Sequence, residues 1–333
     1  MANAPAPVIS SMDHPAERVA PATDGRDLGA LLIGHLDDRW QKYRKQLKRC
    51  QKKSSEKSVH DLRVATRRLI SLMDIVVTVA PDDRLRKLRR TLKKRFDALS
   101  LLRDTQVQLL SVEEMLSRFP QLETFRTVLK VREQRQRKQI DKQVAKAAAG
   151  STGKMLLSTR KRIQLQFEAP AMHSAGLAAV TGAVGAAFAK AVDLRRNVKP
   201  GDTRTIHRLR VAFKKFRYMV EVLQPVLIGV TGDQFKAMNA YQVRMGNIQD
   251  IEVLTADIDT YARRRTRTRK GVQKRSSASR LRLDPSFRPV LLELTTRRIA
   301  LIEEYQKSAD ELFGFWKEPA RMPDQQAHEP ERT

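Results

Sequence analysis

Cysteine is almost absent from this chain, because Cys50 is the only one in 333 residues. A single thiol excludes a disulfide within the chain and a zinc site built from cysteines, and it is consistent with a reducing compartment. Aromatic residues amount to 5%, and glycine and proline occur 14 times each. These low counts argue against an all-β fold, whereas the frequent Leu, Ala, Arg, Lys and Gln predict an all-α protein.

Long hydrophobic runs are absent as well. No stretch of 18 or more apolar residues occurs, so we expect no membrane-spanning helix. The most apolar segment is an Ala- and Gly-rich helix expected over residues 174–196, which we predict to be too short and too interrupted by glycine to span a bilayer. The first residues lack the basic and apolar stretches of a secretory signal. We therefore expect a cytoplasmic protein without membrane insertion.

Acidic residues are outnumbered by basic ones. The chain has 37 Asp and Glu against 65 Lys and Arg, which gives a formal net charge of +28. A compact protein with that excess repels itself, so a polyanionic partner is expected. Nucleic acid, a polyphosphate or an anionic membrane surface would each satisfy this requirement.

One stretch of sequence occurs twice. Residues 59–69 read VHDLRVATRRL, and residues 206–216, which start 147 positions later, read IHRLRVAFKKF. Five of the six positions in His-x-Leu-Arg-Val-Ala are identical between the two copies. A second pair of segments, 99–107 and 245–253, aligns at an offset of 146. Two matches at nearly the same offset indicate an internal duplication of a helical half.

Both copies of the repeat sort in the same way on a helix of 3.6 residues per turn. Apolar side chains fall on one face, and basic side chains fall on the other together with a single histidine, His60 or His207. Val64 and Val211 are the shared exceptions, since both sit among the basic residues. One such helix would ordinarily present a solvated charged face, and a lone histidine would ordinarily bond an interior partner. The repetition of both features favours a binding face instead.

The pattern predicts helices along most of the chain, flanked by disordered segments at 1–26 and 315–333. The intervening domain, 27–314, divides into halves at 27–170 and 171–314, with a basic linker at 263–282 that contains ten Lys and Arg and no acid. Arg103 falls on an apolar face, so we expect it to pair with a carboxylate. The expected helices span about 27–53, 57–79, 82–118, from after Pro120 to 145–149, 155–167, 174–196, 203–224, 231–262 and 284–314.

A basic helix face suits phosphate ligands. Guanidinium groups grip phosphate oxygens with two donors, and lysines add point charges. A row of such groups one helical turn apart can engage successive phosphates of a polymer, and His60 and His207 would donate a hydrogen bond or a charge. Nucleic acid is the rival ligand. Base-stacking platforms are scarce, because only 18 aromatics occur and several fall on core faces, but backbone binding through residues 263–282 stays open.

Metal binding and catalysis find little support in the sequence. His60, His207, Asp104 and Asp250 could supply nitrogen and oxygen ligands if the halves face each other, but no local histidine spacing indicates a metal site. The two aspartates are expected to orient Arg or His side chains of the neighbouring repeat helix. No Gly-rich phosphate loop and no Ser or Cys nucleophile signature occurs. We therefore predict a protein that is not an enzyme, and a metal-dependent phosphohydrolase is the less favoured alternative.

The two His-x-Leu-Arg-Val-Ala helices are each followed, about 43 residues on, by an Asp-containing segment (Arg103-Asp104 and Gln249-Asp250). This arrangement resembles the CHAD family, the conserved-histidine α-helical domain, over roughly residues 27–314. The resemblance implies two four-helix halves related by pseudo-twofold symmetry, with a basic central channel that binds inorganic polyphosphate. It also implies association with polyphosphate granules. Nucleic acid stays open as a secondary polyanionic partner.

The resemblance and the repeat together give the predicted polyphosphate-binding residues, with no catalytic residue, metal or cofactor expected. They are the histidines and basic residues of the two repeat helices and basic residues of the helices that follow: His60, Arg63, Arg67, Arg68, Arg89, Arg90, Lys93, Lys94, His207, Arg210, Lys214, Lys215, Arg217 and Lys236.

Overall fold

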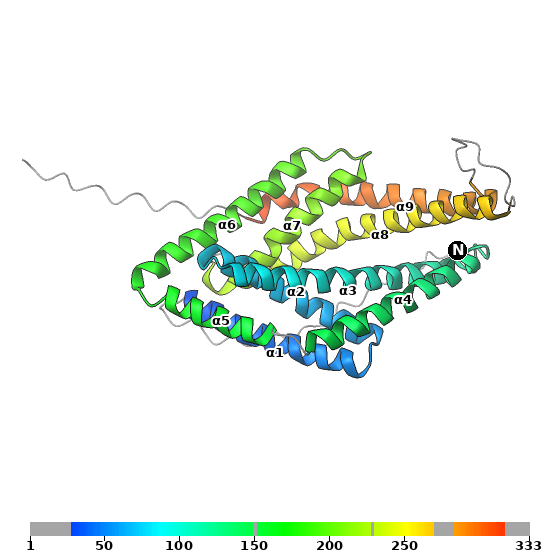
Figure 1. The fold of residues 1–333 in the computed structure, drawn as a ribbon. Coiled ribbons are helices and arrows are strands. Elements are labelled where there is room, and N and C mark those ends of the chain that lie inside the picture. Colours follow the sequence, from blue (N-terminus) through cyan, green and yellow to red (C-terminus); the bar gives the residue numbers. More distant parts are fainter. Residues whose placement is uncertain (1–27, 149–151, 228–229, 270–282, 317–333) are drawn as a thin grey trace, which may run out of the picture.

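The computed structural model describes residues 28–148, 152–227, 230–269 and 283–316. Within these ranges the chain is helical and contains no strand, which confirms the all-α prediction (Figure 1). The predicted segments 1–26 and most of 315–333 lie outside the described residues. The long helices are α1 (Leu28–Lys52), α2 (Glu56–Val79), α3 (Asp83–Met115), α4 (Leu122–Ala148), α5 (Thr152–Gln166), α6 (Pro170–Arg196), α7 (Thr203–Leu223), α8 (Gly232–Arg269) and α9 (Arg288–Lys307).

Helix starts follow local capping chemistry. Ser55 caps α2 by accepting a hydrogen bond from the backbone N–H of Ser58, and Asp82 caps α3 in the same way through Arg84. Asp202 caps α7, with its carboxylate 3.1 Å from the backbone nitrogen of Arg204. Side-chain oxygens at these positions satisfy N–H groups that have no partner within the helix. The starts of α2, α3 and α7 therefore fall within one residue of the sequence prediction.

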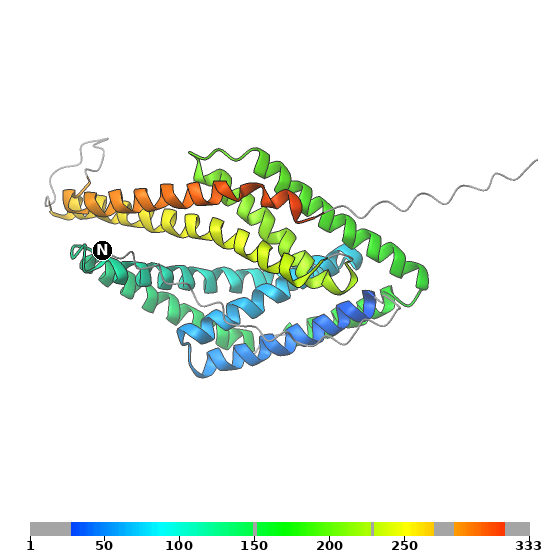
Figure 2. The ribbon, with the colours of Figure 1, turned by 180° about the vertical axis from the view of Figure 1, so that it is seen from behind.

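The helices pack in the same serial order in both halves. Helices α1 to α4 pack in sequence, each on the next, and helices α6 to α9 repeat that order. Helix α5 packs on α1 and α3, so the first half contains the fifth helix that the sequence pattern predicts at 155–167, where the family resemblance implies four. Figures 1 and 2 show α3 beside α4 and α8 beside α9 as two arms, with α2 and α7 near their base. This order fits the duplication, which remains our interpretation of the repeat.

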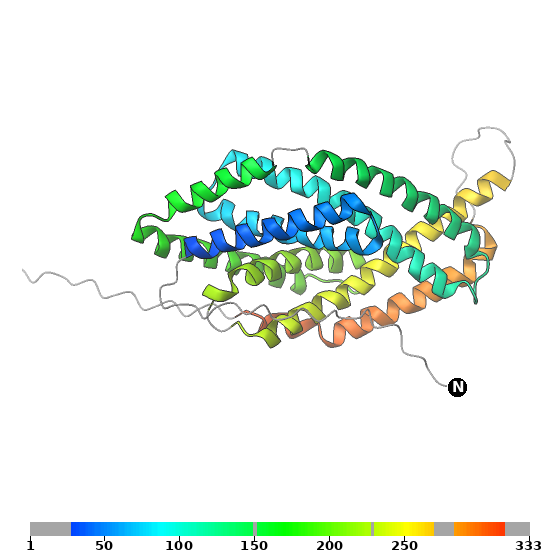
Figure 3. The same cartoon turned by 90° about the horizontal axis from the view of Figure 1, so that it is seen from below.

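Two hydrophobic clusters hold the halves together. The larger one contains most of α1, α2, α6 and α7 with the first part of α3 and of α8. The smaller one lies at the far ends of the arms, where Met115, Phe119 and Phe125 meet Phe287 and other residues of the second half (Figure 3). Between the clusters, α3 and α8 carry polar residues such as Asp104 and Asp250. The polar middle of the molecule is thus bounded by apolar contacts on two sides.

Polar ties across the arms reinforce the smaller cluster. The carboxylate of Asp257 on α8 accepts hydrogen bonds from Arg132 at 2.6 Å and from Gln108 at 3.0 Å. Arg118 pairs with Glu293 at 3.1 Å. Each tie joins the first half to the second, so the arms are fixed to one another beyond the point where α2 and α7 meet.

Helix α2 departs from the simple picture of a packed back and a basic front. In its C-terminal half Ile70, Ser71 and Met73 are all buried, because α2 contacts α1, α3, α6 and α7. Ser71, which helical periodicity places on the same face as Arg67, donates a hydrogen bond from its hydroxyl to the carbonyl of Arg67. The amphipathic description therefore holds only for the N-terminal half of the helix.

Two helices, α8 and α6, extend further than the sequence predicts. Helix α8 continues to Arg269, so the first seven residues of the predicted linker 263–282 are helical, and residues 270–282 lie outside the described chain. Helix α6 begins at Pro170, and its residues 171–196 are long and apolar enough to cross a membrane by length and composition. The prediction that this segment is too short is therefore wrong. In this structure α6 packs on α7 and buries Val180 and Val184 in the larger cluster.

Candidate anion-binding site

The repeat helices α2 and α7 pack against each other and bring their basic faces together. Arg63 and Arg67 of α2 and Arg210 of α7 all act electrostatically on the amine of Lys214, which lies on α7. We call these four residues the cation cluster. All four side chains are half-buried. Their convergence places four positive charges from two different halves at one location.

Within the part of the chain that the structure describes, the cation cluster forms no ion pair. Among the residues that the structure describes, Arg63, Arg67, Arg210 and Lys214 make no ion pair with a carboxylate, whereas most surrounding cations do. The Nε atoms of the three arginines are buried and have no hydrogen-bond acceptor. Unpaired buried charge is costly, because desolvation is not offset by a counter-charge. Such a cluster is a candidate site for an external anion.

Two aromatic rings lie next to the cluster. The Tyr218 ring centroid lies 4.6 Å from the guanidinium carbon of Arg67 and 5.8 Å from Nζ of Lys214. The Phe96 ring of α3 lies 6.0 Å from the guanidinium carbon of Arg63 and 5.8 Å from the same Nζ. The negative ring faces attract cations and so offset part of their desolvation. The rings hold the cations close together without neutralising them.

The crowding of like charges alters the acid–base properties of the cluster. Burial, followed by repulsion from the three arginines and Arg217, lowers the pKa of Lys214 to about 7. Burial also lowers the pKa of Arg63 and of Arg67, with further lowering from their neighbouring arginines. A bound anion would remove this repulsion and stabilise the charged form of each group.

Asp104 and Asp250 lie at the edge of the cluster. Each residue as a whole is exposed, but neighbouring protein atoms keep part of the water from its carboxyl group, and this desolvation raises the pKa of each. The arginines act in the opposite direction, with Arg63 the largest for Asp104 and Arg210 the largest for Asp250. No basic side chain of the described residues donates a hydrogen bond to either carboxylate, so no direct contact supports the expected role of these aspartates in orienting Arg or His side chains. The described residues also contain no group of three or more metal-ligating side chains.

Several predicted site residues are neutralised by acids of the protein. Arg68 lies 3.3 Å from Glu221 of α7, and its ion pair joins the two halves. Arg89 pairs with Asp74. Local pairs also hold Lys93 on Asp97 and Lys236 on Asp233. Arg217 is buried beside Tyr218, and its Nε donates to Gln242 at 3.0 Å. The remaining predicted cations are exposed and have no recorded contact with the cluster: Arg90, Lys94 and Lys215.

The structure does not bring the two histidines together. His60 lies beside Arg63 and Arg103, and burial and these charges lower its pKa. His207 is exposed and lines an open pocket with Arg204, Arg208 and Glu252. Figures 1 and 2 show that the N-terminal ends of α2 and α7, which carry the histidines, diverge. Each histidine therefore lies toward a separate edge of the basic region.

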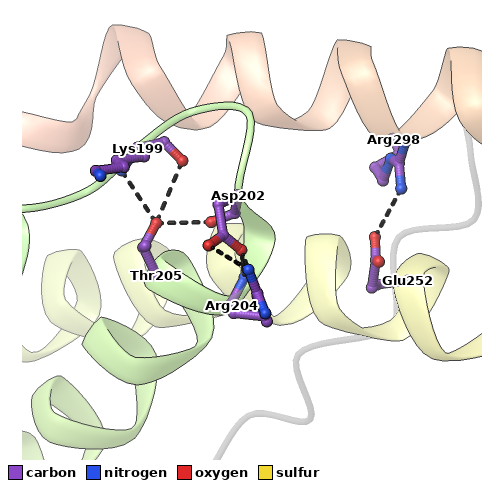
Figure 4. Close-up of polar contacts among 6 residues, drawn as sticks. All are labelled: Lys199, Asp202, Arg204, Thr205, Glu252 and Arg298. Atoms are coloured by element: carbon purple, nitrogen blue, oxygen red, sulfur yellow. Dashed lines mark hydrogen bonds and ion pairs between the residues drawn. The ribbon is translucent and has the colours of Figure 1, made fainter.

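The pocket beside His207 is fixed by polar contacts at the start of α7 (Figure 4). Asp202 binds both the backbone and the guanidinium of Arg204. The hydroxyl of Thr205 donates to the carbonyl of Asp202 at 2.6 Å. Across the pocket, Glu252 of α8 accepts a hydrogen bond from Arg298 of α9 at 3.0 Å. Acids and bases are balanced here, in contrast to the cation cluster.

The sequence did not predict that Phe96 lies beside the cation cluster, but it did predict that Arg103 is paired. Helical periodicity places Phe96 on the apolar face of α3, but its half-buried ring lies beside cations of both α2 and α7. No periodicity signal distinguishes such a residue from a core phenylalanine. Arg103 was expected to pair with a carboxylate, and it does so with Glu56.

Comparison with known proteins places these features in a wider context. The sequence profile of one family, described as the CHAD domain, matches residues 30–258. The crystal structure of the CHAD domain from the plant Ricinus communis superposes with a TM-score of 0.59 and 15% identity, covering 88% of this chain and 93% of that one. PptA from Streptomyces chartreusis superposes with a TM-score of 0.55 and 14% identity, covering 86% of this chain and 99% of that one. No curated protein matches the sequence.

Proposed function

This chain belongs to the CHAD domain family, and on that premise we propose that it binds inorganic polyphosphate without hydrolysing it. The observation that carries the proposal is the cation cluster, in which Arg63, Arg67, Arg210 and Lys214 converge without an ion pair to any carboxylate of the described residues. We propose further that the cluster lines the predicted central channel. The formal net charge of +28 supports a polyanionic ligand over a small neutral one.

The chemistry of the cluster favours phosphate groups. Guanidinium groups bind phosphate oxygens through paired donors, and four cations from two helices can engage consecutive groups of a chain. The desolvation that disfavours the empty cluster also strengthens its attraction for an anion, because the local dielectric constant is low. A polymer with one charge per phosphate satisfies several of these cations at once.

Nucleic acid is the competing ligand of the binding class. Proteins that bind single strands offer aromatic faces for base stacking, but Phe96 and Tyr218 already lie against cations. This arrangement supports a ligand without bases. A competition experiment separates the two: polyphosphate should displace bound RNA or DNA at matched phosphate concentration, and failure to do so would favour a nucleic-acid protein.

The binding residues can be tested together. Replacing Arg63, Arg67, Arg210 and Lys214 by Gln should abolish binding of long-chain polyphosphate while leaving the helical circular dichroism intact, because unpaired charges are removed from the interior. A matched variant removes four cations held in local ion pairs, Lys42, Arg86, Arg126 and Lys190. It should retain most of the affinity. Undiminished binding by the cluster variant would overturn the assignment.

The proposal that the protein is not an enzyme has its own test. A phosphohydrolase would release phosphate from polyphosphate or nucleotides in the presence of a divalent metal, and His60→Ala would abolish that release. We expect no release with magnesium, manganese, zinc or calcium. We also propose a cytoplasmic location on polyphosphate granules, which fluorescence microscopy of the tagged protein can check against a granule stain.

A further inference from the structure

Lys214 is chemically distinct within the cation cluster. Its three neighbours are arginines, which hold their charge at any physiological pH, whereas an amine can lose its proton and act as a nucleophile. Its Nζ lies 5.8 Å from the ring centroids of both Phe96 and Tyr218. Among the described residues it has no carboxylate partner that would hold the proton. The amine is therefore both weakly solvated and free to react.

The surroundings of Lys214 would also position a suitable reagent. Arg63, Arg67 and Arg210 have buried Nε atoms without acceptors, and all three act on the Lys214 amine. A phosphate group held by these guanidiniums would lie next to Nζ. A small molecule that carries a reactive carbonyl on its phosphate would then present that carbonyl to the amine at high effective concentration.

We propose that Lys214 is a modification site for acyl phosphates, whose phosphate is held by the three arginines of the cluster while the acyl group passes to Nζ. This inference rests on the proposed function in one respect: both require the cation cluster to bind phosphate. The lone pair of Nζ attacks the carbonyl carbon, and the bond from that carbon to the phosphate oxygen breaks. The phosphate leaves with the electron pair of that bond and takes up, directly or through water, the one proton that the nitrogen loses, so that hydrogen phosphate and an amide remain.

Acid–base chemistry supports this assignment. Because burial and the neighbouring arginines lower the pKa of Lys214 to about 7, about nine tenths of the amine in the empty site is unprotonated at pH 8, against less than about 1% for an ordinary lysine. A bound phosphate dianion raises the pKa, but three guanidiniums remain to offset its charge. Acylation removes the charge of Lys214, so the modified protein would bind polyphosphate less tightly.

Lys215 provides an internal reference, because it is the adjacent lysine on α7 and is exposed. The full-length protein is treated with acetyl phosphate at pH 8.5 and digested with a protease that cuts after acidic residues, which releases the peptide spanning residues 203–221. Fragment-ion mass spectrometry then separates acetylation at the two positions. We expect acetylation of Lys214 to be at least about tenfold faster than that of Lys215, and equal rates would overturn the proposal.

Two further arms test the role of the arginines. Excess inorganic phosphate should protect Lys214 and leave Lys215 unaffected. Arg210→Gln should slow acetylation of Lys214 by acetyl phosphate far more than acetylation by an N-hydroxysuccinimide ester, which has no phosphate. Lack of protection, or equal slowing with both reagents, would show that the phosphate is not held by the cluster and would contradict the proposal.

A polyphosphate titration of the same preparation separates this inference from the proposed function. If polyphosphate binds but Lys214 reacts no faster than Lys215, the modification site is wrong and the binding function stands. If Lys214 is acetylated selectively but polyphosphate neither binds nor protects it, the small-anion site stands and the binding function is wrong.

Discussion

The affinity for polyphosphate should depend on pH mainly through Lys214. In the free protein the pKa of this amine is lowered to about 7 by burial and by the arginines around it. A bound phosphate chain stabilises the ammonium form, so binding above pH 7 requires uptake of a proton. The affinity is then constant at low pH and falls as the pH rises through 7.

The size of the fall in affinity follows from the pKa of Lys214. If Lys214 is fully protonated in the complex, the affinity falls by about 15-fold between pH 7 and pH 8.5 at constant salt. Guanidiniums stay charged in this range, and the pKa of His60 is lowered from an ordinary value that already lies below 7. Desolvation raises the pKa of Asp104 and of Asp250, and the arginines lower it. Lys214→Arg leaves both carboxyl groups in place and so isolates the contribution of the amine. Lys214→Arg retains the charge but has no proton to take up, so its affinity should change less than about threefold over the same range.

Isothermal titration calorimetry provides the assay. Titrations with long-chain polyphosphate, in which terminal phosphates are few, in two buffers of different ionisation enthalpy give the number of protons taken up. We expect close to one proton at pH 8.5 for the natural chain and close to zero for Lys214→Arg. His207→Gln serves as a control and should keep the full pH dependence. An unchanged pH dependence in Lys214→Arg would refute the reasoning.

Three predictions concern the stability of the fold. Burial is the main cause that lowers the pKa of His35 to about 4. The neutral histidine therefore contributes its full share of the unfolding free energy above pH 6.5 and loses it as the pH falls through 4. Between pH 7 and pH 4.5 the unfolding free energy of the natural chain, measured in urea, should fall by about 2.5 kcal/mol more than that of His35→Gln. Asp257→Asn weakens the bonds to both Arg132 and Gln108 and should lower the unfolding free energy by about 1–2 kcal/mol. Asp233→Asn, which changes an exposed ion pair, should lower it by less than about 0.5 kcal/mol. Equal losses would contradict the role of Asp257 in joining the two arms. Phe213 is fully buried against Phe216 and Tyr241, so Phe213→Ala should cost about 3–5 kcal/mol in the same assay, and a cost below about 1 kcal/mol would contradict the packing of the larger cluster.

The helical architecture was largely predictable from the sequence. Caps and prolines are local signals, so the starts of α2, α3 and α7 could be placed within one residue. The extension of α8 was missed because the block of basic residues resembles a mobile segment. In the structure Asp259 pairs with Arg263, and Arg265 reaches Asp284, so the charges of this segment are partly compensated within the fold.

The four residues of the cation cluster could be predicted from the sequence. Which of the other predicted cations are neutralised by acids could not. The repeat identified Arg63, Arg67, Arg210 and Lys214, because their chemistry recurs on the same helix face. It could not show that Arg68 is neutralised by Glu221, since that partner lies on the repeat helix of the other half. Which cations remain free depends on where distant acids come to lie, and helical periodicity contains no information on that.

The salt dependence of polyphosphate binding tests the central claim most directly. Four cations neutralising four phosphates predict a slope of log affinity against log salt of about −3, or a loss of about 50-fold between 50 and 200 mM salt. Arg63→Gln with Arg210→Gln should halve the slope, to about −1.4. Arg86→Gln with Lys190→Gln removes the same charge from local pairs and should leave the slope near −3. Equal slopes for the two double variants would contradict the claim that the cation cluster binds the chain.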